Sequence, residues 1–527
     1  MTFAEKLYEK INCFSKKVAI SKGDENITYE VLNNISLRIG RLFDDKALNQ
    51  SVVGIVGQRN FSVYFGILGS IYSGLTYVPI NEKYTTDRIL KIIKESKVSV
   101  LIGNKKSITS IKGSINSKNI KVILMPEEDY SEELNILPRE IKYFYKSDLF
   151  YLKPIEPKEI LSSHIFYILF TSGSTGNPKG VMVTDKNIDI FIKNISKFYN
   201  LPFAYKASQT FDLGFDLSVV DLFFTFFNGG QLCLLNQEEL IMPYDYIKRE
   251  KIDFWYSVPT LASFMYKMGY LLPNSFPNLK YSLFCGEALP KYLGDAWQEA
   301  APNSTIENYY GPTEATVSIT RFLYKKEFKN RSYNNDILPI GNLFEGHSFA
   351  LVDEKLNKVK NDEKGHLIIK GDQLSKGYIN DIKKTQKVFR KIPWDNSNGE
   401  WYLTGDLAFV NSFKEIEYAG RIDNQIKIAG RRIEIGEIEA ALLKSKILKD
   451  IVVVPKEDSN GVVASLIGFT TSKVNNDLLK NINEAALKYI EKLFIPKKII
   501  TIEKIPLTTS GKTDRKNLFI ISKDLDI

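Results

Sequence analysis

Short apolar runs rich in β-branched residues recur along the first half of the chain, and they constrain its fold most strongly. Helical patterns separate several of them, such as the amphipathic stretch from Phe61 to Tyr72. The runs are SVVGIVG (51–57), VSVLIG (98–103), KVILM (121–125), FYILFT (166–171), GQLCLL (230–235), DFWYSV (253–258) and YSLFCG (281–286). Runs without polar alternation are typical of strands buried on both faces of a parallel sheet. The sequence therefore predicts an α/β architecture.

The chain has 527 residues, which is too long for a single core at about 150 residues per domain. Its character changes near residue 420, where GRIDNQIKIAGRRIEIGEIEAAL is charged and punctuated by glycine. Two strand patterns, a helix candidate from Asn476 to Phe494 and a further strand pattern follow. We therefore expect a large domain over 1–422 and a small α+β domain over 423–527.

Composition excludes several classes of protein. With 44% hydrophobic and 25% charged residues, the chain is typical of soluble globular proteins. Its apolar stretches are far shorter than the roughly 18–20 residues that span a bilayer, and its first residues do not form a signal peptide. Three cysteines provide no disulfide framework and no metal cluster, so we expect a cytoplasmic protein without a membrane partner.

The net charge of +9 is spread along the chain without any recognisable nucleic-acid-binding module. We therefore expect no nucleic-acid partner. A solvated basic surface explains this charge most simply, and an acidic partner or an anionic substrate is the alternative.

The sharpest single motif is FTSGSTGNPKG (170–180), directly after an apolar strand pattern. Its glycines allow backbone N–H groups to approach an anion, and its hydroxyls and lysine add donors and positive charge. The segment therefore suits phosphate oxygens. It does not fit the G-x-x-x-x-G-K-[ST] pattern of ordinary P-loops, which disfavours a Walker-type kinase or ATPase.

Two further motifs precede this loop in the sequence, and four follow it. They are ITYEVLN (27–33), YVPINEKYTTDRI (77–89), NYYGPTEATV (308–317), WYLTGDL (401–407), GRIDNQIKIAGRRIEIGEIE (420–439) and PLTTSGKTDRKNL (506–518). With them the chain resembles the adenylate-forming enzymes, which include amino-acid adenylation domains, acyl-CoA ligases and luciferases. The resemblance implies an N-terminal domain of two parallel-type α/β subdomains plus a distorted β-barrel, with a small mobile α+β C-terminal domain.

The resemblance also implies a two-step reaction. A carboxylate attacks the α-phosphate of Mg-ATP, giving an acyl-adenylate and pyrophosphate, and a thiol then displaces AMP. Such a reaction needs in-line positioning and neutralisation of charge on phosphate oxygens. The implied catalytic residues are Lys512, Glu314, Thr313 and Lys179, with Glu314 also a ligand of Mg²⁺.

The same resemblance assigns the nucleotide site and the hinge. Residues expected at ATP are Thr171, Ser172, Gly173, Ser174, Thr175, Gly176, Gly286, Glu287, Ala288, Asn308, Tyr309, Tyr310, Gly311, Asp406 and Arg421. Tyr310 would stack on adenine and Asp406 would accept hydrogen bonds from the ribose. Asp423 resembles the residue about which the C-terminal domain swings, and Gly430 would face the incoming thiol arm.

The stretch FDLGFDLSVVD (211–221) indicates the class of substrate. In amino-acid adenylation domains, an aspartate placed like Asp216 binds the α-ammonium of the substrate. A carboxylate in an apolar stretch would be a poor neighbour for a simple acyl chain. Asp216 therefore favours an amino acid, whereas Asp212 is expected to be a loop or capping residue.

The other pocket positions are carried over from the same family. They are Leu217, Val220, Tyr256, Leu283, Cys285, Tyr309, Val317 and Ser318, closed by Lys512. Apart from Asp216 and Lys512 none is charged, and two are tyrosines, so we expect a small neutral amino acid. The patterns are similar to prolyl-adenylating enzymes and to D-alanine–carrier protein ligases, which ranks L-proline first and alanine second.

No carrier domain follows Lys512 in this sequence, so a free-standing phosphopantetheinylated carrier protein is the expected acceptor. Two alternatives stay open. An acyl- or aryl-CoA ligase of the same superfamily would form a coenzyme A thioester without a carrier. A non-catalytic nucleotide-binding protein would show no pyrophosphate exchange with any amino acid.

Overall fold

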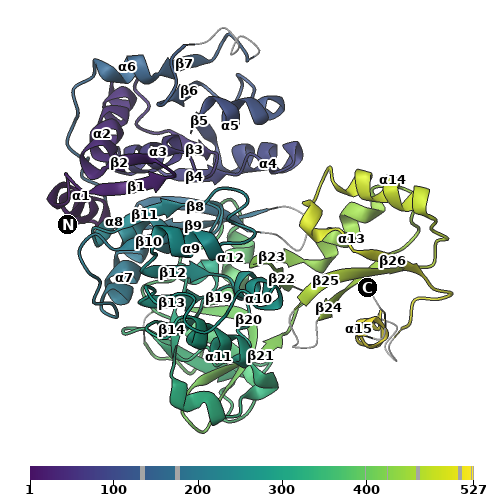
Figure 1. Ribbon diagram of the computed structural model, residues 1–527. Helices are drawn as coiled ribbons and strands as arrows, with labels where there is room; N and C mark the ends of the chain where they lie inside the picture. Colours follow the sequence, from purple (N-terminus) through teal and green to yellow (C-terminus); the bar gives the residue numbers. More distant parts are fainter. Residues whose placement is uncertain are drawn as a thin grey trace. The chain divides into compact units, whose positions relative to one another are not determined.

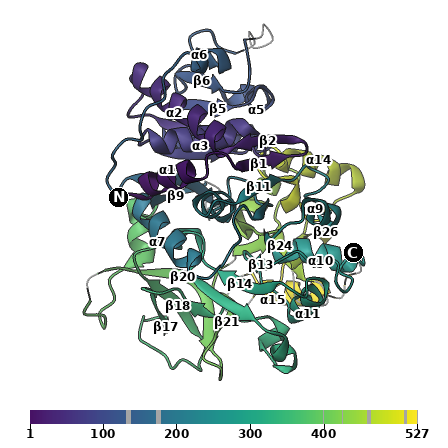
Figure 2. The same cartoon turned by 60° about the vertical axis from the view of Figure 1, so that its left-hand side comes forward.

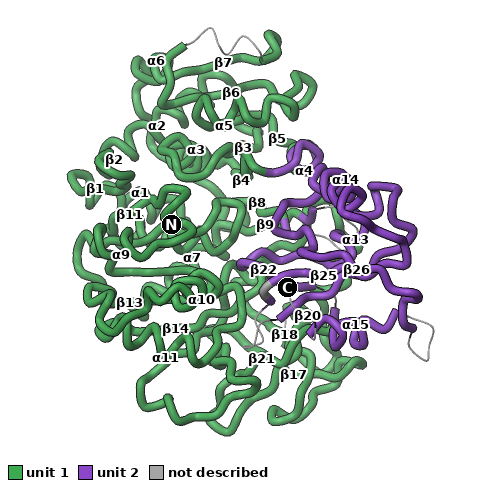
Figure 3. The backbone as a smooth tube through the Cα atoms, turned by 45° about the vertical axis from the view of Figure 1, so that its right-hand side comes forward, with its two compact units in different colours: residues 1–83, 92–170, 180–422 green, residues 84–91, 171–179, 423–527 purple. Residues whose placement is uncertain are grey.

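The computed structural model describes residues 1–130, 137–171, 178–397, 399–423, 425–457, 463–507, 513–523 and 525. The chain divides into two compact units (Figure 3). Unit 1 comprises residues 1–83, 92–170 and 180–422, and unit 2 comprises 84–91, 171–179 and 423–527. The expectation that the C-terminal part moves about Asp423 stays a prediction.

In the described part of unit 1, nine strands form a mixed sheet. Its order is β16 (Asn342–Leu343), β15 (Thr320–Tyr324), β14 (Thr305–Tyr310), β13 (Tyr281–Phe284), β12 (Phe254–Ser257), β10 (Lys206–Gln209), β11 (Gln231–Leu234), β1 (Val18–Lys22) and β2 (Glu25–Thr28). The six central strands from β14 to β1 pair in parallel, and antiparallel strands flank them on both sides. Figure 1 shows β12, β13 and β14 side by side.

A second large sheet contains seven described strands. Its order is β7 (Lys142–Tyr145), β6 (Val122–Met125), β5 (Val98–Gly103), β3 (Val52–Val56), β4 (Tyr77–Ile80), β8 (Ile165–Thr171) and β9 (Lys179–Thr184). The pairings from β7 to β8 are parallel. The apolar runs seen in the sequence are therefore the central strands of two parallel-type sheets, and this part of the predicted fold class is confirmed.

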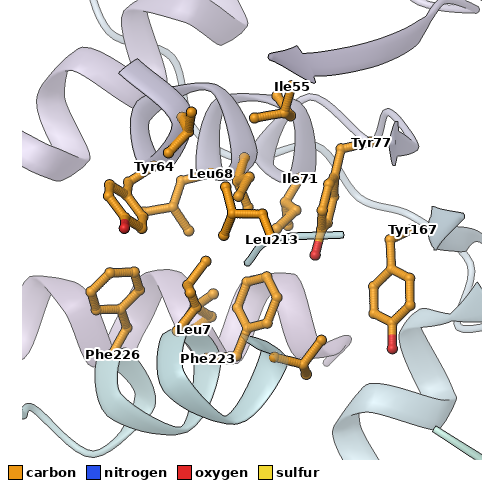
Figure 4. Packing of buried hydrophobic residues seen from close by; sticks show 14 of the residues in the cluster. Leu7, Ile55, Tyr64, Leu68, Ile71, Tyr77, Tyr167, Leu213, Phe223 and Phe226 are labelled. Atoms are coloured by element: carbon orange, nitrogen blue, oxygen red, sulfur yellow. The ribbon is translucent and has the colours of Figure 1, made fainter. Parts of the chain in front are cut away.

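One continuous apolar core contains residues of both sheets and of the helices packed on them. In Figure 4, Tyr64, Leu68 and Ile71 of α3 (Phe61–Tyr72) face Phe223 and Phe226. These two phenylalanines belong to a π-helical turn (Val220–Phe224) and to α8 (Thr225–Phe227). The expectation of an amphipathic helix at 61–72 was wrong, because all residues of α3 are buried, as suits a sequence that is apolar on every side.

The remaining helices of the N-terminal part connect or cover the strands. They are α1 (Phe3–Cys13), α2 (Tyr29–Asp45), α4 (Thr86–Ser96), α5 (Lys105–Ser110), α6 (Lys146–Phe150), α7 (Asp185–Ser196), α9 (Tyr244–Glu250), α10 (Pro259–Lys267), α11 (Lys291–Ala300) and α12 (Ile382–Val388). Across the described ranges, no helix combines the length and the apolar character needed to cross a bilayer.

The last part of unit 1 is a curled antiparallel sheet, the counterpart of the expected distorted β-barrel (Figure 2). Its described strands are β17 (Ser348–Val352), β18 (Gly365–Lys370), β19 (Phe389–Arg390), β20 (Trp401–Val410) and β21 (Ile416–Arg421). All of its pairings are antiparallel, and β20 joins β18 and β19 to β21.

Unit 2 contains a hairpin and a small sheet covered by helices. Its elements after Asp423 are β22 (Gln425–Ile428), β23 (Arg431–Glu434), α13 (Ile435–Leu443), β24 (Val452–Glu457), β25 (Val463–Thr470), α14 (Asn476–Ala486), β26 (Lys498–Thr501) and α15 (Arg515–Lys523). The helix expected over 476–494 ends at Ala486, and Lys492–Phe494 forms a separate 3₁₀ turn. Ile490 and Phe494 are buried in the core of this unit, which explains why the apolar pattern continues beyond the helix.

Candidate active site

Three neighbouring parallel strands place the predicted pocket residues on one face of the nine-stranded sheet. Tyr256, Leu283 and Glu307 stand side by side in the register of β12, β13 and β14. Because side chains alternate along a strand, Cys285 and Tyr309, two residues further on, share this face. The opposite face carries other residues, such as Trp255, Phe284 and Ile306, which belong to a separate core cluster.

Most of the predicted amino-acid-binding residues lie in the same apolar cluster. The members are Leu217, Val220, Tyr256, Leu283, Cys285, Tyr309 and Val317. Ser318 is also fully buried, and its Oγ has no hydrogen-bond partner among the described residues. The structure therefore brings together residues from four separate segments of the chain, as the resemblance implied for a pocket.

Asp216 lies beside this cluster and is half-buried. Burial raises the pKa of Tyr256 well above its usual range, and Cys285 and Asp216 raise it further. Asp216 also contributes to the raised pKa of Tyr167, after burial and after the neighbouring Tyr77. The carboxylate of Asp216 is thus near two tyrosines at the edge of the apolar cluster.

The two other aspartates of this stretch are held differently. Asp212, expected to be a loop or capping residue, forms an ion pair with Arg59 at 3.3 Å and accepts a hydrogen bond from Asn81 at 3.1 Å. Asp221 is 2% exposed and accepts a hydrogen bond from the backbone N–H of Phe211 at 3.3 Å. Burial raises the pKa of Asp221 well above its usual range, against the effect of that bond and of Arg59.

A strained loop after β14 carries predicted residues of both the nucleotide site and the pocket. A Cβ on Gly311 would lie 2.4 Å from the Cα of Ser318, so only glycine fits there. Thr316 and Val317 have φ values of 57° and 73°, which are unfavourable for β-branched residues. Gln373 compensates by donating hydrogen bonds to three carbonyl oxygens of this loop, including that of Ser318 at 2.5 Å.

The predicted nucleotide residues Tyr310, Asp406 and Arg421 form one hydrogen-bonded group. The Tyr310 hydroxyl donates to Asp406 Oδ2 at 2.5 Å, and Arg421 Nη1 donates to Asp406 Oδ1 at 2.5 Å. Strand pairing explains the second contact, because Asp406 and Arg421 stand opposite each other on β20 and β21. Since each carboxylate oxygen has two lone pairs, Asp406 retains acceptor capacity for further donors.

Glu314, the predicted Mg²⁺ ligand, is 1% exposed and follows Thr313 in a 3₁₀ turn after β14. Its Oε1 accepts a hydrogen bond from the Tyr378 hydroxyl at 2.6 Å. No group of three or more His, Cys, Asp or Glu side chains in the described ranges could hold a metal by itself. A single oxygen-donating carboxylate nevertheless fits Mg²⁺, which commonly takes its other ligands from phosphates and water.

Several other predicted residues have definite positions. Gly286 follows β13 with a φ of 92°, and Ala288 lies two residues further along the same turn. Glu287 accepts hydrogen bonds from the backbone and hydroxyl of Thr260, at 3.0 and 2.5 Å. The Asn308 amide donates to the carbonyl of Pro339 at 2.9 Å, so this side chain also braces the backbone.

The phosphate loop is described only at its ends. Thr171 is the last residue of β8, and Lys179 is the first residue of β9. In unit 2, Lys179 Nζ lies 3.7 Å from a carboxylate oxygen of Glu434, and Asp423 Oδ1 accepts a hydrogen bond from the N–H of Gln425 at 3.2 Å. The predicted residues outside the described ranges are Ser172, Gly173, Ser174, Thr175, Gly176 and Lys512.

Sequence reasoning missed several residues that hold this site together. Gln373, Tyr378 and Arg59 each bind a predicted site segment from a distant part of the chain, and no local pattern marks them. Glu307 is different, because it is the only charge in TIENYY and lies two residues before Tyr309. That spacing on a strand is a signal from which its position behind Tyr309 could have been predicted.

Comparison with known proteins gave consistent matches. The profile described as AMP-binding enzyme matches residues 7–379, and the profile of the AMP-binding enzyme C-terminal domain matches 437–512. The D-alanine–D-alanyl carrier protein ligase of Bacillus velezensis is 29% identical over 506 residues, covering 94% of each chain.

Solved structures share the fold over nearly the whole length. The Vibrio cholerae adenylation domain AlmE, solved in complex with glycyl-adenosine-5'-phosphate, aligns with a TM-score of 0.85 and 24% identity, covering 99% of this chain and 98% of that one. PA1221, an NRPS protein containing adenylation and PCP domains, aligns with a TM-score of 0.78 and 21% identity, covering 100% of this chain and 85% of that one. At these identities the likeness concerns the fold.

Proposed function

Because the chain belongs to the AMP-binding enzyme family and is an AMP-forming ligase, we propose that it activates a small neutral amino acid with ATP. The aminoacyl group would then pass to the phosphopantetheine thiol of a separate carrier protein. The observation that carries the proposal is the half-buried carboxylate of Asp216 at the edge of an otherwise apolar cluster. A D-alanine–D-alanyl carrier protein ligase as a full-length relative supports both the amino acid and the carrier.

In the first step, an oxygen of the substrate carboxylate attacks the α-phosphorus of ATP, and the bond from that phosphorus to the bridging oxygen of pyrophosphate breaks. The residues would orient the reactants rather than react covalently. Asp406 would accept hydrogen bonds from the ribose hydroxyls, while its bond to Tyr310 fixes that ring for stacking on adenine. Glu314 would hold Mg²⁺, which would neutralise charge on the phosphate oxygens.

The remaining roles follow the motif positions. Thr313 and Lys179 would contact phosphate oxygens, together with the loop 171–176. Lys512 would bridge the substrate carboxylate and the nucleotide during the first step. In the second step the thiol attacks the acyl carbon, AMP leaves with the bonding electrons, and the thiol proton is released to solvent or base.

The pocket residues support a small substrate. Two buried tyrosines, Tyr256 and Tyr309, occupy the strand ends where a long side chain would need room. D-alanine is the first candidate, because the ligase that resembles this chain over 94% of its length is named for it. Proline, which the sequence patterns placed first, stays a prediction.

The test is ATP–pyrophosphate exchange with purified protein over a panel of glycine, both alanine enantiomers, proline and the other proteinogenic amino acids. We expect exchange with one small neutral amino acid, and transfer of that amino acid to a phosphopantetheinylated carrier protein. Exchange driven only by aryl or fatty acids, with a coenzyme A thioester formed in the absence of any carrier, would overturn the proposal.

A further inference from the structure

A chain of buried and partly buried polar groups lies behind Tyr309, on the side of β14 that carries the predicted pocket residues. The hydroxyl oxygens of Tyr309 and Tyr199 are 2.5 Å apart. The Tyr199 hydroxyl donates to Glu307 Oε2 at 2.6 Å, and Arg321 Nη2 donates to Glu307 Oε1. Glu307 is fully buried, and its charge is compensated by Arg321.

The direction of the hydrogen bonds follows from the number of protons. Tyr199 has one hydroxyl proton, which it donates to Glu307, so Tyr309 must donate its own proton to the oxygen of Tyr199. Burial raises the pKa of both tyrosines well above the usual range, and the neighbouring Glu307 raises both further. Both hydroxyls therefore keep their protons, and the chain runs from Tyr309 through Tyr199 to Glu307.

Strand geometry fixes three members of this chain. Glu307 and Tyr309 are two residues apart on β14 and share one face, and Arg321 stands directly opposite Tyr309 on β15. Arg321 reaches Glu307 along the diagonal between the two strands. Its guanidinium lies 4.2 Å from the ring centroid of Phe198, so it is held on a second side.

Tyr199 is fixed by rings rather than by a strand. Its ring centroid lies 4.9 Å from that of Tyr281, 5.3 Å from that of Phe254 and 5.5 Å from that of Phe224, all in edge-to-face contact. The ring of Tyr309 contacts Phe344 at 5.7 Å in the same manner. Neither hydroxyl can leave the chain without disturbing these contacts.

Stability alone does not account for a charged pair at this place. Replacing a buried ion pair by apolar residues of similar volume is often neutral or stabilising, whereas a satisfied polar network fixes one arrangement of its members. Here the member at the end of the chain is the tyrosine that we assign to the pocket.

We infer that Tyr199, Glu307 and Arg321 are positioning residues that hold the Tyr309 ring as a rigid wall of the amino-acid pocket, and that they thereby restrict the enzyme to small side chains. This inference rests on the proposed function, which places Tyr309 at the substrate. Without the chain, the ring could turn aside and admit a larger side chain.

The test is the substitution Tyr199→Phe, which removes one oxygen and keeps the ring. Exchange kinetics are measured with alanine, valine and leucine. We expect kcat/KM for valine or leucine, relative to that for alanine, to rise about tenfold through a lower KM for the larger substrate, while kcat with alanine stays within about threefold. Tyr309→Phe cuts the chain at its other end and should give the same shift.

Tyr281→Phe is the matched control. Its hydroxyl accepts a hydrogen bond from the N–H of Asn200 at 3.2 Å, and its ring touches Tyr199, yet it lies outside the hydroxyl chain. This variant should leave the ratio unchanged. If Tyr199→Phe folds poorly, the ratio of kcat/KM values measured for Tyr309→Phe tests the inference instead.

The proposed function and the positioning role of Tyr199, Glu307 and Arg321 can be disproved separately. A wild-type protein that activates no amino acid overturns the proposed function and the inference with it. A wild-type protein that activates a small amino acid, with unchanged ratios in both Tyr199→Phe and Tyr309→Phe, overturns only the inference. An equal shift in Tyr281→Phe would also overturn it, because any loosening of the aromatic cluster would then suffice.

Discussion

Two regions of unit 1, the predicted nucleotide site and the surroundings of the predicted amino-acid pocket, hold buried carboxylates in opposite ways. Asp406 is 6% exposed and meets a guanidinium and a hydroxyl at 2.5 Å each. Asp221 is 2% exposed and accepts a backbone N–H, while its Oδ1 has no hydrogen-bond partner among the described residues. The first arrangement stabilises a charge, and the second favours the neutral acid.

We interpret this difference in terms of the two expected ligands. A site for ATP can be preorganised, whereas a site for one particular amino acid can leave polar groups for that ligand to complete. At the predicted nucleotide site, Tyr310, Asp406 and Arg421 already bind one another, so they would need little rearrangement on binding ATP. On the amino-acid side, the buried Ser318 hydroxyl is unsatisfied in the described structure, and Asp216 borders an apolar cluster. A ligand with its own donors and acceptors would complete that side.

The largest expected effect is that of Asp406→Asn. Losing charged hydrogen bonds at this position should cost about 2–3 kcal/mol of nucleotide binding, which corresponds to a rise in KM for ATP of about 30- to 150-fold. Because Asp406 is not among the residues predicted to line the amino-acid pocket, the ranking of amino-acid substrates should not change. Exchange kinetics with varied ATP measure KM for ATP, and the same assay with different amino acids measures the ranking of substrates.

Asp395→Asn is the control for this substitution. Asp395 also pairs with a cation in unit 1, Lys370 at 2.7 Å, and this contact and others lower its pKa. Its partners in the described part of the chain, Lys370, Ser397 and Trp401, are not predicted nucleotide residues. An unchanged KM for ATP in Asp406→Asn, or an equal rise in Asp395→Asn, would show that Asp406 is only structural.

Asp221→Asn should stabilise the protein, whereas Asp406→Asn should impair nucleotide binding. The pKa of Asp221 is raised in the folded protein, so its contribution to stability is fully present below the unfolded pKa of about 3.9 and is lost as the pH rises through the folded pKa. Asparagine resembles the protonated acid and does not titrate. We expect this variant to exceed the wild type in stability above that window, by about 1–3 kcal/mol, and to match it at low pH.

Thermal unfolding of wild type and Asp221→Asn, followed from pH 4 to pH 9, measures this difference. The matched variant is Asp212→Asn, whose parent carboxylate is paired with Arg59 at 3.3 Å and which should be less stable than the wild type at neutral pH. If the difference in stability between Asp221→Asn and the wild type does not grow with pH, the raised pKa of Asp221 is contradicted.

The smallest expected effect is that of Ser318→Ala. Its Oγ makes no hydrogen bond to the described residues, so its removal should change stability by less than about 1 kcal/mol. Thr316→Val, two residues away, removes a hydroxyl that donates to the carbonyl of Gln373 at 2.7 Å and should cost about 1 kcal/mol or more. Denaturation curves that reverse this order would argue against an unsatisfied pocket hydroxyl.

Much of the fold could be predicted from the sequence, because apolar strand runs and turn patterns are local. The runs at 230–235, 253–258 and 281–286 are β11, β12 and β13. Errors arose where burial is decided by distant neighbours. The helix at 61–72 is covered on all sides, and Ile490 and Phe494 are buried after their helix has ended.

The candidate site also contains features that could be predicted locally and features that depend on distant neighbours. Motif residues such as Asp406 and Arg421 could be named, but their direct contact depends on a strand pairing that no local pattern reveals. Tyr199 and Glu307 are 108 residues apart, and their hydrogen bond arises only because the segment that follows α7 meets β14 in the folded chain. Partners of this kind follow from tertiary packing rather than from spacing.

The central claim is that Asp216 recognises the amino group of the substrate. It is tested most directly by ATP–pyrophosphate exchange with D-alanine and with propionate, its analogue without the amine, in wild type and in Asp216→Asn. We predict that Asp216→Asn lowers kcat/KM for D-alanine by about a hundredfold, the loss of a charged hydrogen bond at a partly buried site, and leaves that for propionate within about threefold. Equal losses for the two substrates would contradict the account.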